Sequence, residues 1–553
     1  MPDCNSIIPA FCGSKGLSFP QSSCSSMHID GADDVTINQG VGIDLTEGVT
    51  AYDKNGNEIE FTVSPDEIDK CDVGRHSVLY TATGEDYITR PSICGEDELH
   101  IPCDITRGTI TEERIVTITQ ADPPTFEGVD DVTISPNTDF DPMSGVSAED
   151  DNGNALEVTY DGNYDLMARG AIASFVLGEE KSAKSLQITI EPQQAGSGDP
   201  SPDNVRPISG WTGANVSVSG VNVWDEEWEL GYYRNGVKTA NTTSICCKNL
   251  IPIKPGTQYY IGYQGTITCY YNFYDRNGNF MVLSGADAVG RFSMASARAI
   301  TSPSGAYYMA FAMASAYGTT YNNDISINYP STDHDYHAYN GNVYPISWQT
   351  EAGTVYGGTL DVTSGVLTSA RKAMTFSGEW TGTNFAEGTN TCRIFYPYSF
   401  FVDAIKPNAT NICNILCDKL PTFAPDYIYS NDVMGISENR NSSQNGFWIR
   451  IDKSLLSEYS AAGIKAWITA NPVTVLYEFA TPQQYQIEAT PITLLQGENN
   501  VWCDTGSTTV TWEEPIPQGE SYQYAVEGEY TITYTAEDEC GNVGTAIRTI
   551  TVE

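Results

Sequence analysis

The chain has 553 residues, including 49 Gly and 33 Tyr, and is too long to fold around a single core. Its net charge of −43 creates a surface that repels the phosphates of nucleic acids and anionic lipids. We therefore expect no nucleic-acid partner and no membrane insertion. In agreement, the sequence has no run of about 18 apolar residues that could span a membrane. Few stretches repeat with the period of a helix, which predicts an all-β protein of several domains.

The first segment, residues 1–29, is rich in Cys, Pro and Ser and is too short to form a core. We expect it to be a docking segment that contacts a neighbouring subunit. It lacks the basic and apolar regions of a signal peptide, which favours assembly in a host cytoplasm. Most of the 14 Cys are expected to remain thiols there, and none forms the paired CxxC array of a zinc site.

Two copies of one pattern follow the first segment. “AYDKNGNEIEFTV” (51–63) matches “AEDDNGNALEVTY” (148–160). The alternation of apolar and polar residues predicts half-buried strands, and Asn-Gly predicts tight hairpins because Gly56 and Gly153 accept a positive φ. About 90 residues of short strands and turns are typical of an immunoglobulin-like β-sandwich.

The second copy breaks off and resumes at the end of the chain. “GEYTITYTAEDECGN” (528–542) matches “GRHSVLYTATG” (74–84). Equivalent residues are 97 apart in the first half of the copies and 454 apart in the second half, so 357 residues are inserted. A sandwich tolerates an insert at a surface loop where two strand ends lie close together. We therefore predict one immunoglobulin-like domain at residues 30–120 and a second, split domain at residues 124–168 and 520–553.

The strand “GEYTITYTAEDECGN” resembles bacterial immunoglobulin-like repeats of the hyalin-repeat type. Such repeats usually serve as spacers or adhesive modules, so the resemblance implies a scaffold. The first copy departs from the pattern, because it inserts “EDYITRPSICGEDELHIPCDITRGT” before its last strand.

The insert contains long phrases that resemble a module of tail-associated proteins from phages of gut Gram-positive bacteria. They are “SLQITIEPQQAGSGDPSPDNVRPISGW” (185–211), “YPISWQTEAGTVYGGTLDVTSGVLT” (344–368), “VTVLYEFATPQQYQI” (473–487) and “ENNVWCDTGSTTVTW” (498–512). The resemblance implies a bacteriophage virion protein of the tail, neck or head decoration. Its partners would be other virion proteins, and virion symmetry makes a homo-oligomer on the virion surface the expected assembly.

“LIPIKPGTQYYIGYQGTITCYYNFYDRNGNFM” (250–281) resembles carbohydrate-binding jelly-roll modules. We predict two jelly-roll-like β-sandwich lobes in the insert, at residues 171–345 and 346–517. One helix is predicted over residues 454–471, where Leu456, Tyr459, Ile464 and Trp467 lie roughly on one face.

Glycan binding needs exposed aromatic faces beside amide and carboxylate groups. The predicted glycan-binding residues are Tyr259, Tyr260, Tyr263, Tyr271, Tyr274 and Trp348, and further aromatic candidates are Tyr270, Phe273, Trp211, Trp380 and Trp448. Strand alternation places about half of such residues in the core, so packing is the competing interpretation.

Two segments raise the question of a metal ion. Asp150, Asn152 and Asn154 begin like a calcium loop, and Ca²⁺ is the one cofactor considered, but a hairpin accounts better for the same residues. “STDHDYHAY” would bring its two His to one ion only if it were a loop, because strand neighbours at that spacing point to opposite faces.

The sequence does not favour an enzyme. It has only five His for a Ser-His-Asp triad, and it has no nucleophile elbow. Its 71 acidic residues make pairs of carboxylates common by chance, so such pairs are no evidence for a glycosidase. We predict a non-enzymatic virion structural or accessory protein whose outward lobes bind host-surface glycans. The alternatives are a bacterial cell-surface adhesin and a tail-spike glycan depolymerase, which would require a carboxylate pair in a groove.

Overall fold

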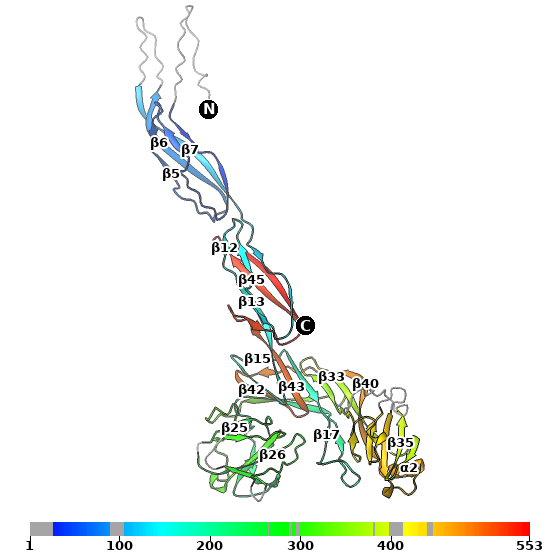
Figure 1. Ribbon diagram of the computed structural model, residues 1–553. Coiled ribbons are helices and arrows are strands. Elements are labelled where there is room, and N and C mark those ends of the chain that lie inside the picture. The colour runs from blue at the N-terminus through cyan, green and yellow to red at the C-terminus, as the bar shows by residue number, and fades with distance from the viewer. Residues whose placement is uncertain are drawn as a thin grey trace, which may run out of the picture. The chain divides into compact units, whose positions relative to one another are not determined.

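The computed structural model describes residues 26–88, 104–263, 265–286, 290–294, 299–379, 382–397, 413–439 and 446–553. Almost every element in these residues is a β-strand, which confirms the predicted all-β class (Figure 1). No helix in this described part is long and apolar enough to cross a membrane. The chain forms two compact units, the first ending at Asn163 and resuming at Pro515–Gln523 and Glu527–Glu553, and the second comprising Tyr164–Glu514 and Tyr524–Val526. Most of the predicted docking segment lies outside the described residues.

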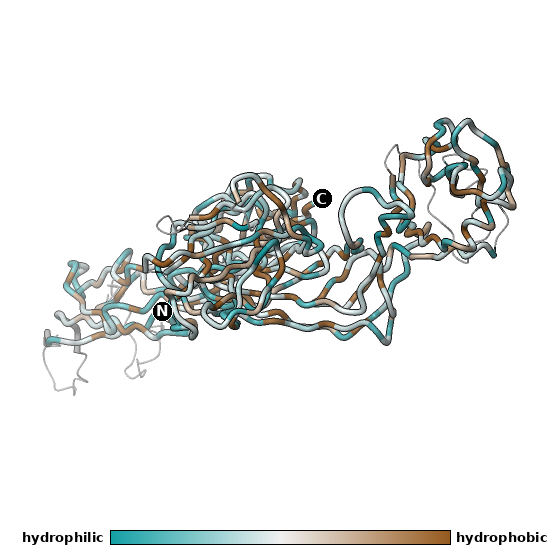
Figure 2. Tube along the Cα trace, turned by 90° about the horizontal axis from the view of Figure 1, so that it is seen from below, coloured by the Kyte–Doolittle hydropathy of each residue, from teal (hydrophilic) through white to brown (hydrophobic). Residues whose placement is uncertain are grey.

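The first repeat consists of two sheets around one apolar core. Its strands are β1 (His28–Asp30), β2 (Val35–Asn38), β3 (Thr50–Tyr52), β4 (Glu58–Ile59), β5 (Phe61–Ser64), β6 (Gly74–Ile88) and β7 (Asp104–Thr119). One sheet has the order β1-β3-β4 and the other β2-β7-β6-β5. Alternate residues of β6 and β7, such as Val78, Tyr80 and Val116, are buried in the core. Alternating brown and teal segments along the chain reflect this pattern (Figure 2).

The second repeat combines strands from both sides of the insert. Its strands are β8 (Thr125–Glu127), β9 (Val132–Ile134), β10 (Asp139–Phe140), β11 (Ser147–Glu149), β12 (Ala155–Leu156), β13 (Thr159–Gly170), β44 (Tyr522–Gln523), β45 (Gly528–Glu537) and β46 (Val543–Val552). β46 runs parallel to β9, with Ile550 opposite Val132, and β45 pairs antiparallel with the start of β13. The red strand β45 therefore lies beside the cyan strand β13 (Figure 1).

A buried arginine joins the two sequence halves of the second repeat. Arg548, from the C-terminal half, donates from Nε to the carbonyl of Asp130 at 3.0 Å and from Nη2 to the carbonyl of Gly128. Its Nη1 donates to the hydroxyl of Tyr534 at 3.3 Å. Arg114 makes the equivalent three hydrogen bonds in the first repeat. The two repeats therefore share this buried-arginine arrangement, although only the second repeat is split.

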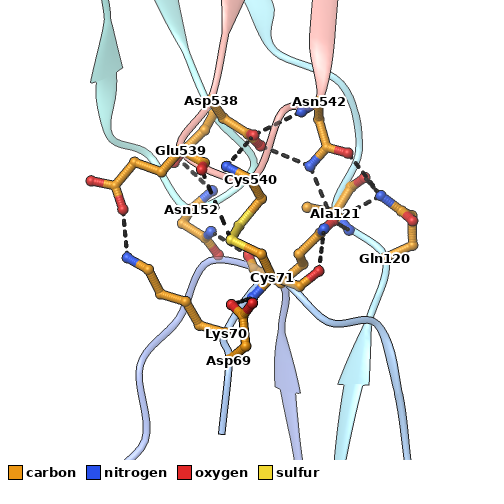
Figure 3. The surroundings of a disulfide bond; sticks show 12 residues. Asp69, Lys70, Cys71, Gln120, Ala121, Asn152, Asp538, Glu539, Cys540 and Asn542 are labelled. Carbon is orange, nitrogen blue, oxygen red and sulfur yellow. Dashed lines mark hydrogen bonds and ion pairs between the residues drawn. A yellow bond between two sulfur atoms is a disulfide. The ribbon is translucent and has the colours of Figure 1, made fainter.

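A disulfide between Cys71 and Cys540 connects the two repeats (Figure 3). Beside it, the side-chain oxygen of Gln39 accepts from Nδ2 of Asn542 at 3.0 Å, and the backbone carbonyl of Gln39 accepts from Nδ2 of Asn152 at 2.9 Å. The hairpins of the second repeat are thus bound both covalently and by hydrogen bonds to the first. The sequence spacing of 469 residues gave no indication of this pairing.

Apart from this pair, the described cysteines are free, as expected for most of them. They are Cys246, Cys247, Cys269, Cys392, Cys413, Cys417 and Cys503, and all but Cys413 are buried. Burial raises the pKa of the Cys247 and Cys417 thiols to about 12, so these groups are neutral packing residues. Cys4, Cys12, Cys24, Cys94 and Cys103 lie outside the described residues.

The insert has a central body that differs from the predicted division at residues 345 and 346. Its strands are β14 (Ile172–Leu177), β15 (Lys181–Ser182), β16 (Ser185–Ile190), β17 (Gln193–Gln194), β18 (Ile208–Ser209), β19 (Gly213–Ser219), β31 (Gly341–Ser347), β32 (Gly358–Asp361), β33 (Val366–Phe376), β36 (Leu416–Cys417), β40 (Val473–Gln486), β41 (Thr493–Leu494), β42 (Gly497–Cys503) and β43 (Gly506–Pro515). β16 pairs with both β32 and β43, so strands from the two predicted lobes share one sheet and one core. The predicted boundary falls inside β31 and is therefore wrong.

Two further cores belong to segments inserted into this body. The first lobe, between β19 and β31, contains β20 (Trp228–Leu230), β21 (Tyr232–Arg234), β22 (Val237–Thr239), β23 (Ile245–Cys247), β24 (Ile251–Pro252), β25 (Gln258–Ile261), β26 (Cys269–Tyr274), β27 (Phe292–Met294), β28 (Ala299–Thr301), β29 (Tyr308–Met313), the 3₁₀ turn η1 (Ser315–Tyr317) and β30 (Ile327–Asn328). The second lobe, between β33 and β40, contains β34 (Thr383–Glu387), β35 (Thr391–Pro397), β37 (Thr422–Phe423), α1 (Tyr427–Ser430), β38 (Gly435–Glu438), β39 (Gly446–Asp452), η3 (Lys453–Leu455) and α2 (Ala461–Ala470).

The helix α2 is shorter than the sequence pattern predicts. Ser460 caps it, because its hydroxyl oxygen accepts from the N–H of Gly463 at 3.0 Å. Ile464 and Trp467 face the core as expected, whereas Tyr459 lies before the cap and is exposed.

Candidate functional site

An open pocket of about 460 Å³ lies on the first lobe, where β21, β26 and β29 meet Arg291, the residue directly before β27. The described residues that line it are Tyr232, Arg234, Asn241, Thr243, Ser244, Tyr270, Arg291, Met313, Ala314 and Ser315. Its size is within the usual range for pockets that bind small molecules.

A hairpin supplies one wall of the pocket. β21 and β22 are joined by Asn235 and Gly236, whose φ angles are 49° and 71°, as a tight two-residue turn requires. Tyr233 points into the core and donates its hydroxyl to the carbonyl of Cys247 at 3.1 Å. Since neighbours on a strand point to opposite faces, Tyr232 and Arg234 lie on the pocket side.

Another part of the lining holds a cation against an aromatic ring. The guanidinium carbon of Arg291 lies 4.0 Å from the ring centroid of Tyr270 and 5.9 Å from that of Tyr232. The buried side chain of Asn272 on β26 donates to the carbonyl of Gly290 at 2.6 Å and so fixes the backbone just before Arg291. The cation–π contact and this hydrogen bond together position Arg291 at the pocket.

Hydroxyl and amide groups complete the lining. The side-chain oxygen of Asn241 accepts from the N–H of Thr243 at 2.6 Å and from its hydroxyl at 2.8 Å. This turn leaves the amide NH₂ of Asn241 as its remaining donor, and Ser244 and Ser315 add two hydroxyls. Aromatic rings beside several polar groups are what a polyhydroxylated ring needs, because its C–H faces stack and its hydroxyls form hydrogen bonds.

Three predicted glycan-binding residues are core residues instead. Tyr259 is 2% exposed, and its oxygen accepts from the N–H of Lys254 at 2.7 Å. Tyr274 is 3% exposed and donates to the carbonyl of Gly236 at 3.0 Å, while Trp348 is completely buried. A ring without an exposed face cannot stack on a sugar, so the prediction is wrong for these three residues.

The other three predicted tyrosines are partly buried and lie outside the lining of the pocket. Tyr260, Tyr263 and Tyr271 each contact another aromatic ring, at centroid distances of 4.1, 5.9 and 5.4 Å. Tyr270, a further candidate from the same strand as Tyr271, does line the pocket. Among the remaining candidates, Phe273 and Trp448 are buried, Trp211 donates its Nε1 to a backbone carbonyl, and Trp380 lies outside the described residues.

The residues considered for calcium form a hairpin turn. Oδ1 of Asp150 accepts from the N–H groups of Asn152 and Asn154 at 3.0 and 2.7 Å, and Oδ2 accepts from Nδ2 of Asn154 at 2.9 Å. The hydrogen bond from the Asn154 side chain, followed by that from its backbone, lowers the pKa of Asp150. The side chain of Asn152 turns away to bond Gln39, which corrects the calcium interpretation. The same turn recurs at Asp275 and at two other sites.

The second segment considered for a metal does not bring its histidines together. His337 bonds the carboxylate of Asp333 at 2.8 Å, whereas the ring of His334 stacks on Tyr260. Throughout the described ranges, no group of three His, Cys, Asp or Glu side chains is arranged to hold a metal ion.

Sequence reasoning missed Tyr232, Arg234 and Arg291. For the first two a signal was present, because “YYRNGV” (232–237) contains the same Asn-Gly turn that predicted the other hairpins. For Arg291 no local pattern exists, since its place depends on the contact with a strand some twenty residues earlier.

No family model matches the chain, and no curated protein matches it. Among solved structures, one that contains CBM51-2 in complex with GlcNAc and INT domains from Clostridium perfringens ZmpB is 9% identical, with a TM-score of 0.12. The match covers 61% of this chain and 50% of that one, so this chain spans about half the length of that protein. A carbohydrate-binding module of a bacterial protein is thus a weak structural neighbour.

Two extracellular cadherin structures are similarly distant. Protocadherin GammaB4 is 10% identical over 96% of this chain and 67% of that chain, with a TM-score of 0.13. Protocadherin Gamma B2 domains 1–5 are 9% identical over 95% and 80% of the chains, with a TM-score of 0.10. Such scores do not define a shared site.

Proposed function

We propose that this chain is a non-catalytic glycan-binding protein whose binding site is the pocket of the first lobe. The observation that carries the proposal is the joint placement of two partly buried tyrosines, Tyr232 and Tyr270, with Arg291 and several uncharged donors around one open cavity. Rings present the apolar surface that a pyranose stacks on, and the polar groups fix its orientation. The described lining contains no carboxylate pair of the kind used in glycoside hydrolysis, and the proposal includes no chemical step.

The proposed setting is the surface of a phage particle. There the protein is an accessory component that forms a homo-oligomer and contacts other virion proteins. The support for this part is the resemblance of residues 185–211, 344–368, 473–487 and 498–512 to a module of phage tail-associated proteins. Detection of the chain by mass spectrometry in purified particles tests the setting. Its absence from particles of a phage that encodes it would contradict this part of the proposal alone.

Glycan-array binding by the full chain tests the binding function. We expect Tyr270→Ala and Tyr232→Ala each to weaken binding about tenfold or more, because each removes a stacking face. Tyr459→Ala is the matched control, since Tyr459 is 52% exposed and lies beside a cation, Lys453, on the second lobe.

The control variant should bind like the wild type. Equal binding by all four proteins would show that sugars are held elsewhere. The absence of binding to every glycan would overturn the proposed function.

A further inference from the structure

A second cavity, of about 270 Å³, lies where the first lobe meets the central body of the insert. It shares no described lining residue with the pocket of the proposed function. Hydrogen bonds join lobe and body, because Lys254 Nζ donates to the hydroxyl of Ser174 at 3.0 Å and Asn500 Nδ2 donates to the carbonyl of Gly220 at 2.9 Å. The volume is near the lower end of the range for small-molecule sites and suits a ligand of about one sugar unit.

Three neighbouring strands of the central body form the floor of this cavity. β19 lies between β31 and β42, and its Ser217 is opposite Val343 on one side and Trp502 on the other. Side chains directly opposite one another in a sheet share a face. Val216 and Val218 project from the other face of β19 into the core. The sheet therefore presents a hydroxyl beside an indole ring to the cavity.

Two serine hydroxyls on this floor have no partner in the protein. Ser217 and Ser219 are 6% and 4% exposed, and both line the cavity. Within the described part of the chain, neither hydroxyl takes part in a hydrogen bond, and neither oxygen is sealed off from the cavity. Because polar groups this deep in a protein are normally hydrogen-bonded, these two hydroxyls point to a ligand that bonds them.

Two carboxylates supply acceptors in the same lining, one from the lobe and one from the body. Asp225 accepts from Nδ2 of Asn249 at 2.8 Å, and Asp504 accepts from the N–H and Nδ2 of Asn215 at 3.0 and 2.9 Å. These hydrogen bonds orient the carboxylates and leave them further acceptor capacity, because an ionised carboxylate has about four lone-pair sites. The described lining contains no Lys or Arg, so an anionic ligand would meet like charges there without compensation.

We infer that this cavity is a second glycan-binding site, which takes an uncharged sugar unit. The partly buried rings of Trp502 and Tyr339 offer apolar faces for its C–H surface. Sugar hydroxyls both donate and accept, so they can donate to the two carboxylates and bond the two serine hydroxyls. The inference goes beyond the proposed function because it assigns a separate site and includes no chemical step.

Binding of the full chain to an array of neutral and acidic oligosaccharides, measured over a series of protein concentrations, tests the inference. Ser217→Ala combined with Ser219→Ala should weaken binding to at least one neutral glycan about tenfold, because it removes two hydrogen bonds to the sugar. The melting temperature should be unchanged or higher, because the lost hydroxyls have no partner in the protein. Ser347→Ala is the matched control, since Ser347 is an exposed serine of β31 outside the lining.

The variant Tyr270→Ala, which alters only the pocket of the first lobe, separates the inference from the proposed function. A neutral glycan that the double serine variant binds more weakly, and that Tyr270→Ala and Ser347→Ala bind like the wild type, supports the inference. If the double serine variant binds every glycan like the wild type, or loses only acidic glycans, the inference is overturned, while a loss in Tyr270→Ala still supports the proposed function. A lower melting temperature of the double serine variant would also overturn the inference. If the wild type binds no glycan, both are overturned.

Discussion

Replacing Arg548 by Met should destabilise the split second repeat. Arg548 is 7% exposed and donates to the carbonyls of Asp130 and Gly128 and to the hydroxyl of Tyr534. Methionine retains the apolar stem but cannot donate, so two carbonyls lose a charged partner. A hydrogen bond to a charged group contributes about 1.5–3 kcal/mol, and the lower part of this range applies because both bonds are only partly buried, so the loss of two gives about 3–4 kcal/mol for the repeat.

Hydrogen exchange measured by mass spectrometry on the full chain tests this magnitude. A loss of about 3–4 kcal/mol should accelerate exchange of the most protected amides of β9, β45 and β46 by a few hundredfold, since about 1.4 kcal/mol corresponds to tenfold. The amides of β6 and β7 in the first repeat should change much less.

The first repeat provides the control for this experiment. Arg114 is also 7% exposed and makes the equivalent hydrogen bonds. Arg114→Met should therefore accelerate amide exchange in β6 and β7 more than in β9. The result that would refute this prediction is a free energy of opening, derived from the amide exchange of β9, that differs by less than about 0.5 kcal/mol between Arg548→Met and the wild type. β9 precedes the insert and Arg548 follows it. The substitution can therefore affect exchange in β9 only if the two parts of the chain fold into one domain.

Three further predictions concern other parts of the chain. Cys71→Ser combined with Cys540→Ser should destabilise the first unit by about 2–4 kcal/mol and make its melting temperature insensitive to reductant, as calorimetry with and without reductant would show. Asp432→Asn should lower the melting temperature of the second lobe at pH 7. Hydrogen bonds, that from the Thr391 hydroxyl foremost, lower the pKa of Asp432 to about 2, so this stabilisation is present above about pH 4 and is lost as the pH falls toward 2, where wild type and variant should converge. Asn272→Ala should weaken glycan binding about threefold or more, measured by titration, because it removes the hydrogen bond that holds the backbone beside Arg291 in the pocket.

The local features of the fold were accessible from the sequence. Asn-Gly after Asp predicted hairpins at Gly56 and Gly153, and both glycines have φ near 80° with the aspartate accepting from the backbone across the turn. The match of residues 528–542 to residues 74–84, at an offset of 454 instead of 97, pointed to the strand that begins at Gly528 as the partner of the early strands, and the structure pairs β45 with β13. These features depend on short-range geometry or on an internal repeat, which a single sequence displays.

The features that failed depend on long-range packing. Alternation shows that neighbouring residues face opposite sides, but it does not show which side is the core, and so Tyr259 and Tyr274 were assigned to the surface. The lobe boundary failed because strands on either side of it hydrogen-bond to each other in one sheet, which no local composition change marks. The pocket was only partly predictable, since Tyr270 was a candidate while Arg291 is placed by a contact across the sheet.

The structure of the full chain determined with a bound oligosaccharide from the array tests the central claim most directly. The account predicts sugar density in the pocket of the first lobe, with a pyranose face against Tyr232 or Tyr270 and the sugar in contact with Arg291. Density for the sugar at another surface, with these three side chains uncontacted, would contradict it.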